Sequence, residues 1–267
     1  ATDILLLMLI GLIAGGSGGL LGIGGSLVMI PGMVLLFGSA QQHLYQATAM
    51  IVNFFVMLPA VAQHWRAKAA LRSVTRWMIP STIVGIVLGV YASELGMFRG
   101  NGQGYLQIIF SVFLLYVVLY NLYRLRSPSR MAPIDEAQAA RLSKTLIVTA
   151  IGLPTGLLGG LLGIGGGLFA VPAQQLVLKM PLPKAIANAA GTILWSSVIG
   201  AAVKNYHLAE HGFQVRDALV LALCLIPSAM IGSWYTSAKV HRWPVSIIRV
   251  VFIVVLSYCG WQMLLKG

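Results

Sequence analysis

Long apolar runs separated by short polar segments dominate the chain. The runs cover residues 4–38, 46–62, 77–92 and 105–123, and after a polar segment at 124–143 they resume at 144–179, 185–203, 218–236 and 246–265. As one straight helix, the 35 residues of the first run would extend about 52 Å, whereas the hydrocarbon core is about 30 Å thick. That run must bend back or break, and Gly22-Ile23-Gly24-Gly25 marks the place. The pattern predicts an all-α polytopic membrane protein.

The order of the runs starts again after the polar segment, which indicates an internal duplication. Residues 22–31 align with residues 163–172 at a constant offset, and both segments contain Gly-Ile-Gly-Gly and end in Pro. Ile-Pro-Ser recurs at 79–81 and 226–228. We therefore expect two homologous membrane repeats, residues 1–126 and 143–267, joined by a polar cytoplasmic linker at 127–142. Each repeat would be a Gly-broken helical hairpin followed by three transmembrane helices.

Two relative orientations of the repeats are compatible with this pattern. If each Gly-rich unit is a hairpin, whether re-entrant or spanning, three further crossings follow and the second repeat is inverted. If the unit is one bent crossing, the repeats are parallel. Lys and Arg favour cytoplasmic loops, which puts loop 63–76 and the linker inside and loop 93–104 outside. The cations of the second repeat fit the inverted arrangement better.

Composition and charge agree with a membrane location. The chain is 58% hydrophobic and 9% charged, with a mean hydropathy of +0.87, whereas soluble domains are about 25% charged. Eighteen Lys and Arg against six Asp and Glu give a net charge of +12. These cations lie in short tracts between apolar runs and not on one face, so the expected partner is membrane lipid and not nucleic acid. The first run lacks a basic n-region and is expected to be a structural helix, not a signal peptide.

No catalytic or cofactor-binding constellation stands out. Cys224 and Cys259 both lie inside apolar runs, and two cysteines build neither a disulfide framework nor a zinc site. The sequence contains no Cys/His pair with ligand spacing and no plausible paired carboxylates. We expect no enzyme activity, no cofactor and no metal.

The Gly-rich breaks are the strongest candidates for a binding site. Secondary transporters often pair inverted repeats with broken helices whose ends meet near the middle of the membrane. A helix that starts at Ser26 or Gly167 directs its positive dipole end and unpaired N–H groups at the turn, which attracts anions. The expected substrate-binding residues at the breaks are Gly24, Gly25, Ser26, Gly165, Gly166 and Gly167. For the upstream glycines, close helix packing is favoured instead: Gly11, Gly15, Gly18, Gly19, Gly152, Gly156, Gly159 and Gly160.

A second internal match places polar side chains at membrane depth. Residues 47–53 align with residues 187–193, so Thr48 pairs with Asn188, while Asn53 and Thr192 lie about one turn deeper. Hydroxyl and amide donors suit sulfonate or carboxylate oxygens, and these four side chains are candidate substrate contacts. Interhelical hydrogen bonding is an equal alternative.

Three basic residues are candidates for attracting anions or relaying protons. His64 and Lys204 occupy matching positions at the end of an apolar run, where snorkelling at the membrane interface is the simpler explanation. Arg249 is flanked by apolar residues on both sides. The other ionisable residues near the ends of runs are interpreted as solvated loop or interface groups: Glu94, Glu210, His43, His207, His211 and His241.

The repeated Gly-Ile-Gly-Gly unit that ends at Pro31 and Pro172, together with Ala-Asn-Ala-Ala-Gly-Thr at 187–192, resembles the TauE/SafE family. The resemblance covers nearly the whole chain. The first repeat departs from the pattern at Ser26 and at 50–52, where Met-Ile-Val replaces Ala-Gly-Thr, so a contact through Thr192 would be asymmetric. Members of this family are bacterial inner-membrane permeases implicated in moving sulfite, sulfoacetate and related anions.

The resemblance implies export of a small organosulfur anion, with sulfoacetate or a similar sulfonate preferred and sulfite next. Import by the same fold, a channel, or a membrane scaffold are the alternatives. A channel should show a continuous polar stripe, and a scaffold needs no duplicated Gly-rich break. A homodimer is left open.

Overall fold

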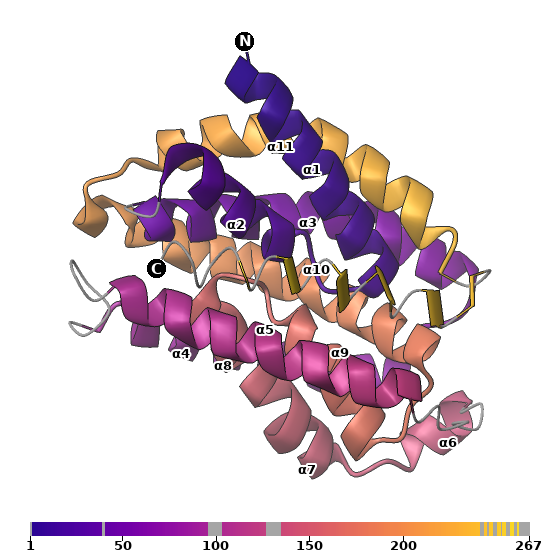
Figure 1. Cartoon of the computed structure of the whole chain (residues 1–267). Coiled ribbons are helices and arrows are strands. Elements are labelled where there is room, and N and C mark those ends of the chain that lie inside the picture. The colour runs from indigo at the N-terminus through magenta and orange to yellow at the C-terminus, as the bar shows by residue number, and fades with distance from the viewer. Residues whose placement is uncertain are drawn as a thin grey trace.

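The computed structural model describes residues 2–38, 41–95, 103–126 and 135–240, and scattered positions between 243 and 261 (Figure 1). Within these residues the regular structure is entirely helical. Six of the helices are long and apolar enough to cross a membrane. The prediction of an all-α polytopic membrane protein is therefore confirmed. Arg249, Cys259 and most of the run at 246–265 lie outside the described residues.

The helices follow the order that the hydrophobic pattern predicts. Those of the predicted first repeat are α1 (Thr2–Leu21), α2 (Ser26–Phe37), α3 (Gln42–Arg66), α4 (Arg72–Ser93) and α5 (Gln103–Arg126). Those of the predicted linker and second repeat are α6 (Glu136–Ala140), α7 (Lys144–Leu146), α8 (Leu153–Leu162), α9 (Gly167–Val177), α10 (Leu182–Tyr206) and α11 (Val215–Ser237). A π-helical turn, Ile147–Gly152, joins α7 to α8, and a 3₁₀ turn, Leu208–His211, follows α10.

Both Gly-rich units break a helix where the sequence predicts. The chain leaves α1 at Leu21 and starts α2 at Ser26, and it leaves α8 at Leu162 and starts α9 at Gly167. At the first break Gly22 and Gly24 have φ values of 63° and 80°, which are left-handed and favour glycine. At the second break the glycines at 163, 165 and 166 have φ values of 71°, 71° and 85°.

Helices from opposite repeats pack against each other through glycines. In Figure 1, α1 crosses α11, and a Cβ added at Gly19 would lie 2.6 Å from the carbonyl oxygen of Ser233 in α11. In the same way, a Cβ at Gly85 of α4 would lie 2.9 Å from the Cα of Gly156 in α8. The hairpin of each repeat therefore rests on a long helix of the other repeat. Close packing explains the upstream glycines at 11, 15, 19, 152, 156 and 160.

Two 25-residue helices, α3 and α10, run antiparallel through the middle of the bundle. Lys204 near the end of α10 bonds His43 near the start of α3. At the opposite end, the Asn188 side chain near the start of α10 accepts a hydrogen bond from the Leu71 N–H just after α3. This central pair carries most of the polar side chains described below.

Candidate anion-binding site

The two Gly-rich turns meet in the middle of the molecule. A Cβ added at Gly167 would lie 2.6 Å from the Cα of Ile23 and 2.9 Å from the carbonyl oxygen of Gly22. Only glycine permits so close an approach of two backbones. We call the region formed by residues 22–26 and 163–167 the glycine junction. All of these residues are buried, so the junction is closed to solvent in this conformation.

The side chain of Asn53 joins the two turns. Its Oδ1 accepts a hydrogen bond of 2.8 Å from the Gly25 N–H, and its Nδ2 donates to the Ser26 hydroxyl at 2.6 Å. Nδ2 also donates, at 3.4 Å, to the carbonyl oxygen of Ile164 in the other turn. Asn53 is fully buried on α3. One amide therefore holds the start of α2 and the turn before α9 together.

The starts of α2 and α9 are similar but not identical. Neither helix has a side-chain cap at its N-cap residue, Gly25 or Gly166. Gly25 has a right-handed conformation with φ of −87°, whereas Gly166 is left-handed. The first-turn N–H groups of a helix have no acceptor within that helix, so both starts present donors and a positive dipole end to the junction.

The structure gives the other predicted polar residues different roles. The hydroxyls of Thr48 and Thr192 donate to the carbonyl oxygens of Leu44 and Asn188, one turn back in their own helices. In this conformation neither hydroxyl has a proton left to donate to an anion. Asn188 bonds the Leu71 N–H at 2.7 Å and the Gln174 side chain at 3.0 Å, away from the junction. Interhelical and intrahelical bonding account for these three residues.

A cavity of about 620 Å³ opens on the face predicted to be cytoplasmic. Its charged lining comes from the loop after α3, the start of α4, the predicted linker and the start of α10: Lys68, Arg72, Asp135, Glu136 and Lys184. The Glu136 carboxylate accepts hydrogen bonds from the Arg72 and Ser73 N–H groups at 3.0 and 2.6 Å, at the start of α4. Leu71 and Gly191 also line the cavity. The Leu71 N–H donates to the Asn188 side chain, and Gly191 follows Asn188 by three residues in α10.

A buried ionic cluster lies at the other end of the α3–α10 pair. The Lys204 ammonium is 1% exposed and donates to the Ser93 hydroxyl at 2.8 Å and to the Glu94 carboxylate at 2.9 Å. It also lies 2.8 Å from Nδ1 of His43, which must accept because an ammonium only donates. The cluster ties α10 of the second repeat to α3 and α4 of the first.

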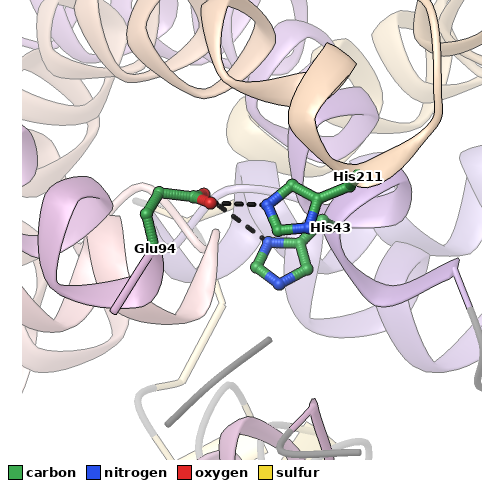
Figure 2. Close-up of side chains that lie close together, drawn as sticks. All are labelled: His43, Glu94 and His211. Atoms are coloured by element: carbon green, nitrogen blue, oxygen red, sulfur yellow. Dashed lines mark hydrogen bonds and ion pairs between the residues drawn. The ribbon is translucent and has the colours of Figure 1, made fainter. Parts of the chain in front are cut away.

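Two histidines complete this cluster (Figure 2). The rings of His43 and His211 stack with their centroids 3.7 Å apart, and Nε2 of His211 lies 2.5 Å from the Glu94 carboxylate. Glu94 follows the last residue of α4. Burial raises the pKa of this carboxyl, but the charge and hydrogen bond of Lys204 and the hydrogen bond of His211 outweigh burial and lower the pKa to about 2.

His43, Glu94 and His211 offer ligand atoms that lie within 4.8 Å of one another, a spacing compatible with a metal ion. The Lys204 ammonium, however, already bonds His43 and Glu94 and balances the carboxylate charge. A divalent cation would have to displace this ammonium and leave it buried without a counter-charge, which is costly. The geometry therefore fits an ion-pair network better than a metal centre.

These positions correct the interpretation of several ionisable residues. Snorkelling does not describe His64 or Lys204, because both side chains are buried. Glu94 and His43 are buried as well and are not solvated. The partners of Glu94 lie far away in the sequence, so its place at the end of an apolar run gave no sign of the cluster. Arg249 lies outside the described residues.

Comparison with known protein families shows which family the chain belongs to. The family model "Sulfite exporter TauE/SafE" matches residues 7–263. The chain belongs to this family. It is thus a member of a membrane transporter family and, with its six long apolar helices, a multi-pass membrane protein.

Relatives within the TauE/SafE family carry transporter names. The chain is 27% identical to the probable membrane transporter protein MamO of Paramagnetospirillum magneticum, over 98% of this chain and 45% of MamO. It is 27% identical to the probable membrane transporter protein YunE of Bacillus subtilis, over 98% of this chain and 97% of YunE. The chain thus spans less than half of MamO but nearly all of YunE. No solved structure matches this TauE/SafE chain significantly.

Proposed function

We propose that this protein exports a small organosulfur anion, sulfoacetate or a similar sulfonate, or sulfite, across the bacterial inner membrane. The name of the family model, sulfite exporter, supports the cargo class. The observation that carries the proposal is the glycine junction, where the starts of α2 and α9 face each other beside Asn53. Backbone donors and helix dipoles at such a place favour a negative charge without a cationic side chain.

The anion would lie between Gly24, Gly25 and Ser26 on one side and residues 165–167 on the other. In the closed junction the Asn53 Oδ1 accepts from the Gly25 N–H at 2.8 Å. An anionic oxygen is a stronger acceptor than an amide oxygen. We therefore infer that the anion takes over this N–H and that the Asn53 side chain turns to present its Nδ2 donor.

The cavity on the cytoplasmic side supports entry from within the cell. Lys68, Arg72 and Lys184 line it, against the carboxylates of Asp135 and Glu136. A concave site with an excess of one charge concentrates ions of the opposite charge. We infer that this cavity collects the anion before the junction opens towards it.

The arrangement of the helices supports alternating access. Each hairpin carries one half of the junction and packs on a long helix of the other repeat, α1 on α11 and α8 on α4. Inverted repeats of this kind move against each other around a central site in many secondary transporters. The inverted relation of the two repeats is part of the proposal.

Export is energetically favourable for such a cargo. With the cytoplasm negative, each negative charge that moves outward gains about 2.3 kcal/mol per 100 mV, and a dianion gains about twice that. No coupled ion is needed for outward flow. Import would use the same junction with an added energy source, so direction must be measured.

A flux measurement tests the proposal. Proteoliposomes loaded with labelled sulfoacetate or sulfite are given an inside-negative potential, and efflux is followed with and without the protein. We expect protein-dependent efflux that rises with the potential. Absence of efflux of both anions would overturn the cargo assignment, and uptake that requires a proton gradient would favour import.

A further inference from the structure

A polar stripe on α3 leads away from the glycine junction. Gln42, Gln46 and Asn53 are spaced by four and seven residues, so they lie on one face of the helix. Asn53 bonds both turns of the junction. A Cβ added at Gly163 would lie 2.5 Å from the Cβ and Cγ of Gln46, so Gln46 contacts the second turn. The stripe therefore runs from the junction towards the buried ionic cluster.

The amides of Gln42 and Gln46 are the exceptional members of this stripe. Both side chains are at most 1% exposed. Among the described residues, none of their four amide nitrogen and oxygen atoms has a hydrogen-bond partner. An unpaired buried amide is costly, and lipid supplies no partner at membrane depth. By contrast, the buried amides of Asn53, Asn188 and Gln174 are all bonded.

The residues of α10 that correspond to Gln42 and Gln46 in the other repeat show that packing does not require amides at these positions. The alignment of the two repeats pairs Gln42 with Leu182 and Gln46 with Ile186. Gly22 packs on Ile186 just as Gly163 packs on Gln46. The same kind of contact between a turn and a central helix is thus made by Ile186 in one repeat and by the aliphatic part of Gln46 in the other, so the contact itself does not need the amide. Packing alone therefore does not account for an amide at this position, and the amide is available to a ligand.

The charge at this level of the molecule identifies the class of ligand. A Cβ at Gly200 of α10 would lie 3.1 Å from the sulfur of Met50, and the two helices are antiparallel, so Lys204 lies about level with Gln46. The Lys204 ammonium bonds His43, the residue next to Gln42. Amide N–H groups and an ammonium at the same level of the bundle are donors for an oxyanion.

We propose that Gln42 and Gln46, together with the ammonium of Lys204, form a second oxyanion-binding subsite between the glycine junction and the outer face. Glu94 holds Lys204 while this subsite is empty, and the anion on its way out joins Glu94 as a partner of the ammonium. The inference rests on the proposed function, because it takes the released anion to be the same small oxyanion that the junction binds.

The test compares Gln46→Leu and Gln42→Leu with Gln63→Leu, a matched change on the same helix at the opposite end, where the side chain is half-buried. Melting temperatures are measured in detergent with no anion, with sulfite, with sulfoacetate and with inorganic phosphate. Efflux is then measured in proteoliposomes. Removing an unpaired buried amide should keep or raise the melting temperature without anion, so a loss of transport would not come from misfolding.

We expect Gln46→Leu to reduce efflux about tenfold to hundredfold, which is the value of one hydrogen bond to a charged group. Gln63→Leu should transport like the wild type. Gln46→Glu, which places a carboxylate at the subsite, should reduce efflux further. Wild-type rates in Gln46→Leu and Gln42→Leu would overturn the subsite, leave the proposed function intact and indicate that water alone satisfies the amides.

A different result would show that the proposed function, and not only the subsite, is wrong. A wild-type protein that moves neither sulfite nor sulfoacetate would contradict the cargo assignment. The subsite would then stand only if phosphate raises the melting temperature of the wild type but not of Gln46→Leu. If phosphate shifts neither protein, or both equally, the subsite is overturned as well.

Discussion

A single asparagine carries most of the polar contacts at the glycine junction. Asn53 accepts from Gly25 and donates to Ser26 and to Ile164, so it contacts both turns. The other predicted contacts, Thr48 and Thr192, use their hydroxyl protons within their own helices. At the scale of the residue, the account therefore depends on Asn53 more than on any hydroxyl.

Replacing Asn53 by leucine should abolish transport. The change leaves the Gly25 N–H unpaired, which is expected to cost about 1–3 kcal/mol of unfolding free energy, and it removes the donor that faces the anion. Efflux and denaturant unfolding are measured for Asn53→Leu and for Asn205→Leu, whose amide donates to a carbonyl of its own helix at 2.8 Å. Equal efflux in the two variants would contradict the role of Asn53.

The pair of Glu94 and Lys204 gives a pH-dependent prediction. The pKa of Glu94 is lowered from 4.5 to about 2 in the folded protein, so the ionised carboxylate stabilises the fold above pH 4.5 and this contribution is lost as the pH falls towards 2. Glu94→Gln leaves the buried ammonium without its counter-charge and should cost about 3–5 kcal/mol at pH 7.

The measurement is the difference in unfolding free energy between the wild type and Glu94→Gln as a function of pH. We expect a constant difference between pH 5 and pH 8 that shrinks as the pH falls from 4.5 to about 2, because in this range the carboxyl of the unfolded chain takes up a proton before that of the folded protein does. A difference that is already small at pH 7 would show that the pair contributes little to the fold.

At the scale of the element, glycines hold the helices of opposite repeats together. A Cβ at Gly15 of α1 would collide with the carbonyl oxygen of Ala229 in α11. We expect Gly15→Val to lower the unfolding free energy by about 1–3 kcal/mol, because the helices must separate to admit the side chain. Gly191→Ala is the matched control, since no atom lies within 4 Å of its added Cβ. Equal melting temperatures for the two variants would contradict this packing.

The two turns should tolerate alanine unequally. Gly166 has φ of 85°, and a Cβ there would lie 2.5 Å from the Thr155 carbonyl oxygen. Gly25 has φ of −87°, and its Cβ would first meet the mobile end of Met29. We expect Gly166→Ala to lose about 1–2 kcal/mol of stability from the backbone conformation alone and Gly25→Ala to lose less. Melting curves of both variants decide this, and the reverse order would contradict the turn geometry.

The elements themselves could be predicted closely from the sequence. Within the described residues the apolar runs predict the long helices, and the duplicated glycines locate both breaks, so the predicted starts at Ser26 and Gly167 are those observed. Glycine and proline determine which local backbone conformations are allowed, so the positions of the helix breaks can be predicted from the sequence without a structure. The different backbone conformations of Gly25 and Gly166 could not be predicted, because both positions are glycine and their contacts, with Asn53 and with Thr155, come from residues outside the repeated Gly-Ile-Gly-Gly unit.

The site could be predicted only in part. Its glycines follow from the repeat, but the cluster of Lys204 and Glu94 does not, because its members come from four separate segments of the chain. In the sequence, nothing distinguishes Glu94 from the other polar residues that follow an apolar run. Likewise, the unpaired state of Gln42 and Gln46 depends on what surrounds them and not on their spacing alone.

At the scale of the whole molecule, the polar features are arranged along the antiparallel α3–α10 pair. The basic cavity lies at one end, the glycine junction in the middle, and the buried ionic cluster at the other end. The junction and the cluster are both buried, so this conformation is closed at its centre and at the end with Lys204. Transport by this account requires the two repeats to move apart at one end at a time.

The most direct test of the central claim is an experimental structure determined with bound sulfoacetate or sulfite. We predict anion density at the glycine junction, between Gly25 and Gly166, with an oxygen within hydrogen-bond distance of the Asn53 amide. Density at Gln46 in addition would agree with the second subsite. An anion bound elsewhere, with the junction as tightly packed as it is here, would contradict the claim that the two Gly-rich turns bind the cargo.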